Sequence, residues 1–425
     1  MSLRKQIAWS MGATLGIMVM MASMSTAHAS FNMRFKANWK VHYADGNIGN
    51  QVVNNGEETV PIGYVWYSIF TGTGSTFVKS GVLSGSGYTS YFTAENNQNY
   101  WLQLTTIIER DGRIVVMEMP VNGSNCRSYD SALSYYFACV QPTGVPNNTY
   151  KTVSRLFGVS YNSTFHAAVG RVAAQVLLRG DLMGVPEGKQ WRIRASNPGP
   201  GANWYLGDDR FCFSVLNTDL SKFVIAHEFA HAIADHGDHF ITGGIDPPNL
   251  NNPHCHCPSG GAYGHCLTMW LNIDGAQSEG FAEFGATALM NTRTSSDPKL
   301  GYFVEYTTES LPSWLPSAVL SEMTGIRPYG VGMNSQYKYM ENACGWLWPV
   351  DHGTEWDWMT FFWQIWTIGP DELEIDQIVE LWPSGASFGT QWRQWEDIRR
   401  NAQSDLSPTE YQFFLATGLD NGINH

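Results

Sequence analysis

The chain has 425 residues, of which 43% are hydrophobic, 13% aromatic and only 15% charged. This composition excludes a disordered, collagen-like or coiled-coil protein, because such chains have few aromatic residues or many charged ones. The formal net charge is −13 and no run of basic residues is present. We therefore expect neither nucleic acid nor an anionic membrane surface as the main partner. Seven cysteines are too few for a disulfide scaffold in so long a chain, but they allow a few disulfides.

Residues 1–29 have the features of a signal peptide. Arg4 and Lys5 form a positive start, an apolar stretch covers residues 7–24, and an Ala-His-Ala cleavage pattern ends at Ala29. We expect cleavage before Ser30, and export to the periplasm or the medium, where disulfides form. The removed segment carries two positive and no negative charges, so the mature chain has a net charge of −15. An uncleaved membrane anchor is the alternative interpretation; no later segment is long and apolar enough to span a bilayer.

Alternating hydrophobicity predicts a β-sandwich over residues 30–145. In residues 31–43 every odd position is apolar and every even position is polar, which is typical of a half-buried strand. More strand-like runs follow, separated by turns such as Asp111-Gly112, a hairpin signal. Short strands with regular turns are typical of a sandwich. Cys126 and Cys139, at its end, are candidates for a local disulfide.

Helical periodicity dominates after a Pro- and Gly-containing linker at residues 141–150. We expect a second domain over residues 150–425, with a mostly helical C-terminal part, and an α+β fold for the whole chain. The elements expected around the candidate site are a helix at 165–179, a strand at 211–215 and helices at 220–235 and 276–291.

The helix expected at 220–235 contains the sequence His227-Glu228-Phe229-Ala230-His231. Histidines at positions i and i+4 point the same way from a helix, as two ligands of one metal ion must. Apolar residues flank the motif, and burying two imidazoles among them is costly unless a partner such as a metal pairs them. The motif therefore predicts a metal site, with an exposed His/Glu face of a surface helix as the alternative.

A catalytic zinc ion needs a third protein ligand and one open position. Glu279 and Glu283 lie four residues apart in the helix expected at 276–291, so their carboxylates share one face. One can bind the metal while the other accepts the N–H of a ligand histidine; a solvated acidic stripe is the alternative. His236 and His239 are nearer in sequence, but they lie where the first helix is expected to end, so that helix does not fix their direction.

The His-Glu-Phe-Ala-His and Glu-Gly-Phe-Ala-Glu segments resemble the motifs of gluzincin-type zinc metallopeptidases, and the first is similar to the active helix of thermolysin-like enzymes. The resemblance covers about 130 residues. It implies a zincin-like catalytic domain in which His227, His231 and Glu279 bind Zn²⁺, Glu228 is the general base and Glu283 supports a ligand histidine. Together with the signal peptide, it implies a secreted peptidase that cleaves protein or peptide substrates through a zinc-activated water.

Other features leave alternatives open. Cys255, Cys257 and Cys266, which lie among histidines, favour a disulfide in an exported protein, with a second zinc site as the alternative. His352 is a candidate for stabilising the transition state, although a turn histidine is the commoner role. The aromatic cluster at 356–366 favours buried packing over carbohydrate stacking.

A second class of function is also consistent with the sequence. The β-sandwich is weakly similar to transthyretin-like modules, so the chain could be a non-catalytic secreted binding protein with a degenerate zincin domain. The presence of Glu228 favours the enzyme, because a purely structural zinc site does not need a glutamate beside its histidine.

Overall fold

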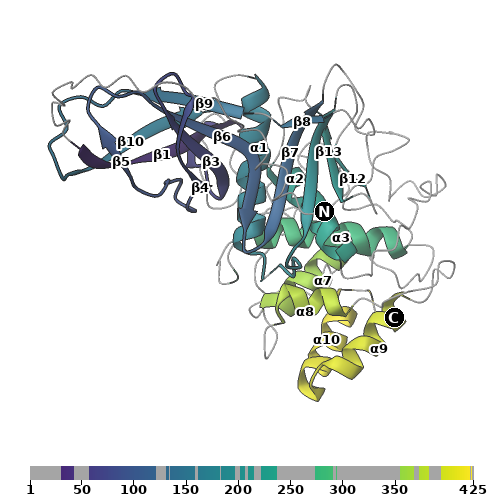
Figure 1. Cartoon of the computed structure of the whole chain (residues 1–425). Helices are drawn as coiled ribbons and strands as arrows, with labels where there is room; N and C mark the ends of the chain where they lie inside the picture. Colours follow the sequence, from purple (N-terminus) through teal and green to yellow (C-terminus); the bar gives the residue numbers. More distant parts are fainter. Residues whose placement is uncertain are drawn as a thin grey trace, which may run out of the picture.

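A computed structural model describes residues 30–42, 57–120, 131–133, 135–157, 161–181, 183–196, 202–205, 209–214, 222–236, 273–290, 293, 355–367, 373–381, 394–421 and 423. Within these residues the chain combines two β-sheets with a set of helices (Figure 1). The α+β class expected from the sequence is confirmed.

The smaller sheet is built around β1 (Ser30–His42). β1 pairs in parallel with β10 (Tyr150–Phe157) on one side and antiparallel with β2 (Glu57–Pro61) and β5 (Phe92–Glu95) on the other. The odd-numbered residues of β1 up to Val41 are buried and the even-numbered residues from Asn32 to Lys40 are partly exposed. The alternation in the sequence therefore predicted both the strand and its buried face.

The larger sheet has the strand order β12-β13-β11-β7-β6-β3-β4, with β8 paired to β7 and β9 paired to β6. Its strands are β3 (Val65–Thr71), β4 (Thr76–Val82), β6 (Tyr100–Arg110), β7 (Arg113–Pro120), β8 (Ser131–Leu133), β9 (Tyr135–Val140), β11 (Gln190–Ser196), β12 (Ala202–Tyr205) and β13 (Arg210–Ser214). β6 and β7 form a hairpin whose turn residues, Asp111 and Gly112, both have positive φ angles. This is the turn that an Asp-Gly pair favours.

Aromatic side chains fill the space between the two sheets. Trp39 of β1 packs edge-on against Tyr136 of β9, with ring centres 5.3 Å apart. Phe92 of β5 contacts both Phe35 of β1 and Tyr100 of β6. These contacts join the sheets face to face into one hydrophobic core.

Strands from both sides of residues 145–150 share each sheet. β10 pairs with β1 in the smaller sheet, and β11 pairs in parallel with β7 in the larger one. The segments 30–145 and 150–425 are therefore connected by backbone hydrogen bonds at two places. In addition, Glu118 of β7 forms ion pairs with Arg192 and Arg194 of β11.

The helices around the candidate site match the expected positions. α1 (Tyr161–Leu178) and α2 (Lys222–His236) pack together, and α3 (Ile273–Met290) packs between α2 and α7 (Glu355–Thr367). α8 (Ile375–Glu380), α9 (Gln394–Asp405) and α10 (Pro408–Asp420) follow beyond α7 (Figure 1). None of the helices in the described part of the chain has both the length and the hydropathy needed to span a bilayer.

The aromatic cluster of α7 belongs to the core. Its large side chains are almost fully buried, namely Trp358, Phe361, Phe362, Trp363 and Trp366. They pack against α3 and against Trp395 and Phe414 of the last helices. The prediction of buried packing is therefore confirmed for these five residues, and the side chain of Trp356 lies outside what the structure describes.

Several residues named from the sequence lie outside the described part of the chain. These are the segment 1–29, Cys126, Cys255, Cys257, Cys266, His239 and His352. Cys139 is described and its thiol is free. The candidate Cys126–Cys139 disulfide is therefore not supported, because the Cys139 thiol in β9 has no disulfide partner.

Candidate metal centre

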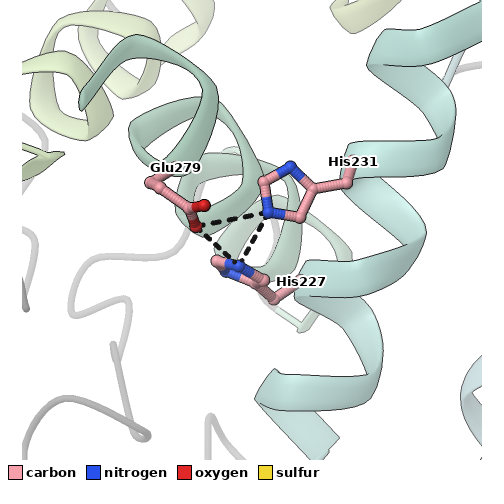
Figure 2. Close-up of side chains that lie close together, drawn as sticks. All are labelled: His227, His231 and Glu279. Carbon is pink, nitrogen blue, oxygen red and sulfur yellow. Dashed lines mark hydrogen bonds and ion pairs between the residues drawn. The ribbon is translucent and has the colours of Figure 1, made fainter. Parts of the chain in front are cut away.

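α2 is held against the larger sheet by its apolar face. The ring centre of Phe229 lies 4.6 Å from that of Phe211 in β13 and 5.5 Å from that of Trp191 in β11. Ile225 and Ile233 are fully buried one turn before and after Phe229. The apolar face of α2 packs against the sheet. His227 and His231 lie on another face of the helix and point toward α3 (Figure 2).

A close contact between helices brings α3 to this face of α2. A Cβ atom built on Gly285 would lie 2.5 Å from the Cβ atom of Ala230, so only a glycine fits at this crossing. The end of α1 is tied to the same helix, because Arg179 Nη1 donates to the carbonyl of Ala288 at 2.6 Å. These contacts fix the position from which Glu279 and Glu283 reach α2.

His227, His231 and Glu279 converge on one point (Figure 2). The Nε2 atoms of the two histidines are 3.0 Å apart. Glu279 Oε2 lies 3.0 Å from Nε2 of His227 and 3.2 Å from Nε2 of His231. In the part of the chain that is described, these three residues form a group that could hold a metal ion.

The spacing of these atoms suits a small divalent cation. Ligand atoms of a tetrahedral zinc site, at about 2.0–2.1 Å from the metal, lie about 3.3 Å from one another. The observed separations of 3.0–3.2 Å are close to this value. Two imidazoles and one carboxylate are also a donor set found at catalytic zinc, with one position left open.

Glu283 binds the ring nitrogen of His227 that faces away from Glu279. Its Oε1 atom accepts a hydrogen bond from Nδ1 of His227 at 2.8 Å, and its side chain is almost completely buried. Burial by itself lowers the pKa of His227, but the carboxylates of Glu283 and Glu279 outweigh burial and hold this pKa well above its ordinary value. The group of side chains therefore favours a positive charge at its centre.

Two further residues lie next to the ligands in sequence. Glu228 directly follows His227 in α2 and is 8% exposed. Ser278 Oγ lies 3.4 Å from Nδ1 of His231, a contact that sequence reasoning missed. The only signal for it was a hydroxyl residue next to an expected ligand. His227, His231, Glu279 and Glu283 are thus brought together as the sequence predicted.

Comparison of the chain with known protein families, with curated proteins and with solved structures found no match. The geometry of the site is therefore the basis for the proposed function.

Proposed function

We propose that the chain is a secreted zinc metallopeptidase of the gluzincin type, with a zincin-like catalytic region after residue 150. One observation carries the proposal. Two imidazole nitrogens and one carboxylate oxygen from separate helices, α2 and α3, lie within 3.0–3.2 Å of one another. Such convergence of largely buried polar groups is costly without a cation between them.

The donor set supports zinc and an open site. Nitrogen and oxygen ligands suit Zn²⁺, and three protein ligands leave room for water or a substrate carbonyl, whereas structural zinc sites have four protein ligands. A bound zinc ion would polarise the scissile carbonyl and bring the pKa of a water molecule toward neutrality. His227, His231 and Glu279 are the residues that would hold it.

The remaining roles belong to the two other carboxylates. Glu228 is the general base: it takes the proton of the attacking water and passes it to the leaving amine. Its side chain is buried, and the residue directly follows the ligand His227 in α2. Glu283 orients the imidazole of His227 through Nδ1, so that Nε2 is directed toward Glu279.

The test compares wild-type protein with Glu228→Gln, which keeps the shape of the side chain and removes the base. Zinc content is measured by mass spectrometry, and hydrolysis is measured on casein. We expect one zinc per chain in both proteins and a loss of hydrolysis of about a hundredfold or more in the variant.

The outcomes separate the two classes of function. Zinc binding without hydrolysis by the wild type would favour a non-catalytic binding protein. Unchanged hydrolysis by Glu228→Gln would contradict the proposed mechanism.

A further inference from the structure

The outward face of β1 carries two adjacent cations. Arg34 and Lys36 occupy even positions of the strand, and the buried Phe35 between them fixes this orientation. The guanidinium of Arg34 lies 4.0 Å from the ring centre of Tyr88 and 4.8 Å from that of Tyr91. The ammonium group of Lys36 lies 5.4 Å from the ring centre of Tyr88. The rings hold both cations in place on the sheet surface.

These cations have no carboxylate partner among the described residues. Arg34 Nε donates to Thr152 Oγ1 at 3.1 Å, which leaves the terminal nitrogens of the guanidinium for a ligand. The strand register places Glu95 opposite Ser30, four residues before Arg34, and Glu57 opposite His42, six residues after Lys36. The chain has a net charge of −13, so this pair of cations has the opposite sign to the molecule as a whole.

The neighbouring strand adds apolar groups on either side of the cations. In the register of β1 with β10, Thr152 and Ser154 lie beside Arg34 and Lys36. The rows before and after contain Tyr150, which is 70% exposed, and Leu156, which is 50% exposed. Successive rows lie about 6.6–6.8 Å apart, because side chains repeat on one face every two residues. Four successive rows along the strand direction therefore present an apolar, a cationic, a second cationic and an apolar side chain.

We propose that this surface, the basic face formed by Arg34, Lys36, Tyr150 and Leu156, docks an extended acidic polypeptide segment. In an extended chain the side chains on one side repeat at the same spacing of about 6.6–6.8 Å. A segment whose alternate residues are apolar, acidic, acidic and apolar therefore meets all four positions at once. The free nitrogens of Arg34 can bind a carboxylate through two parallel hydrogen bonds.

Two other anionic partners fit the basic face less well. Recognition of an anionic membrane usually involves clusters of about four to eight basic residues, more than this face presents. An acidic polysaccharide would stack on several aromatic ring faces, but the guanidinium of Arg34 already covers Tyr88 and Tyr91, which leaves Tyr150 as the exposed ring of the basic face. The charge spacing along an extended peptide is the feature that favours a polypeptide.

The inference does not depend on the proposed function. The basic face belongs to the smaller sheet, which lies apart from α2 and α3 (Figure 1). Binding at this face requires neither metal nor hydrolysis. It can therefore be measured with full-length Glu228→Gln protein, so that cleavage cannot remove the probe.

The probe is a fluorescent peptide, Gly-Leu-Ser-Glu-Ser-Glu-Ser-Leu-Gly, and the readout is fluorescence anisotropy at low salt. We expect saturable binding that weakens about tenfold or more with Arg34→Gln/Lys36→Gln, and that weakens as salt is added. A matched control, Arg399→Gln/Arg400→Gln on α9, also removes two positive charges and should leave the affinity unchanged. Replacing both glutamates of the peptide by glutamine should weaken binding as much as the double variant does.

A charge-reversed pair keeps the test informative if a single variant is unstable. Arg34→Glu/Lys36→Glu should lose the acidic peptide and bind the same peptide with lysine in place of glutamate. Equal binding of the acidic peptide by wild type and by Arg34→Gln/Lys36→Gln would overturn the proposal. Tighter binding of polygalacturonate or of phosphatidylserine vesicles, dependent on Arg34 and Lys36, would also overturn it.

Discussion

Glu283 Oε1 lies 2.8 Å from His227 Nδ1, on the opposite side of the imidazole from Glu279. The ring is held between two carboxylates of one helix. The hydrogen bond to Nδ1 leaves Nε2 directed at the point where His231 and Glu279 meet. This relationship assigns different roles to two glutamates that are equivalent in sequence pattern.

The first prediction concerns Glu283. We expect Glu283→Ala to weaken zinc binding or activity by about 10–100-fold, because the orienting hydrogen bond to His227 is lost. Zinc affinity is measured by competition with a chromophoric chelator. Glu283→Asp, which keeps a carboxylate, should retain more affinity than the alanine variant. Equal losses in both would point to a packing defect instead.

The second prediction concerns Glu279. Its Oε2 atom contacts both histidines, so Glu279→Ala should remove most bound zinc while the protein stays folded. Metal content and circular dichroism are measured together. His236→Ala serves as the comparison, and we expect little change from it. A zinc-loaded Glu279→Ala protein would contradict the ligand assignment.

The third prediction concerns the ion pairs between β7 and β11. Glu118 bonds Arg194 at 2.9 Å and Arg192 at 3.1 Å, and the Glu118 and Arg194 side chains are both buried. We expect Glu118→Ala to lower the free energy of unfolding by about 3 kcal/mol, since it leaves a buried guanidinium without its carboxylate. Denaturant unfolding provides the measurement. Glu396→Ala, which removes an exposed partner of Arg399, should change stability by less than about 1 kcal/mol.

The fourth prediction concerns acid stability. His166 of α1 is buried and its Nδ1 lies 2.6 Å from the hydroxyl of Tyr136. Burial lowers the pKa of His166 to about 4, from an ordinary value of 6.5. The unfolded chain therefore binds a proton at this residue at a pH where the folded chain does not. Above pH 6.5 His166 is neutral in both states, so it does not lower the free energy of unfolding. As the pH falls toward 4, this free energy decreases by up to about 3 kcal/mol.

The matched variant for this prediction is His166→Gln, which has a polar side chain but no group that titrates in this range. Unfolding free energies of both proteins are measured between pH 7 and pH 4. The difference between wild type and variant should change along this range, with the wild type losing more. Parallel pH profiles would show that His166 does not titrate on unfolding.

Local patterns of the sequence determined individual helices, strands and turns of this protein. The alternation in residues 31–43 is enough to predict β1 and its buried face, because side chains of a strand alternate between two sides. The spacing of His227 and His231, and that of Glu279 and Glu283, is enough to place each pair on one side of its helix. The Asp111-Gly112 turn likewise follows from the conformations that these two residues adopt readily.

The tertiary structure alone decided which strands pair and which helices pack together. The pairing of β11 with β7 and of β10 with β1 joins strands on opposite sides of residues 145–150, and nothing local specifies such partners. The approach of α3 to α2 depends on the contact of Gly285 with Ala230, which joins helices that are separate in the sequence. That approach brings Oε2 of Glu279 within 3.0–3.2 Å of both histidines and Oε1 of Glu283 within 2.8 Å of Nδ1 of His227. Residue spacing fixes directions within an element, whereas distances between elements depend on which apolar faces pack together.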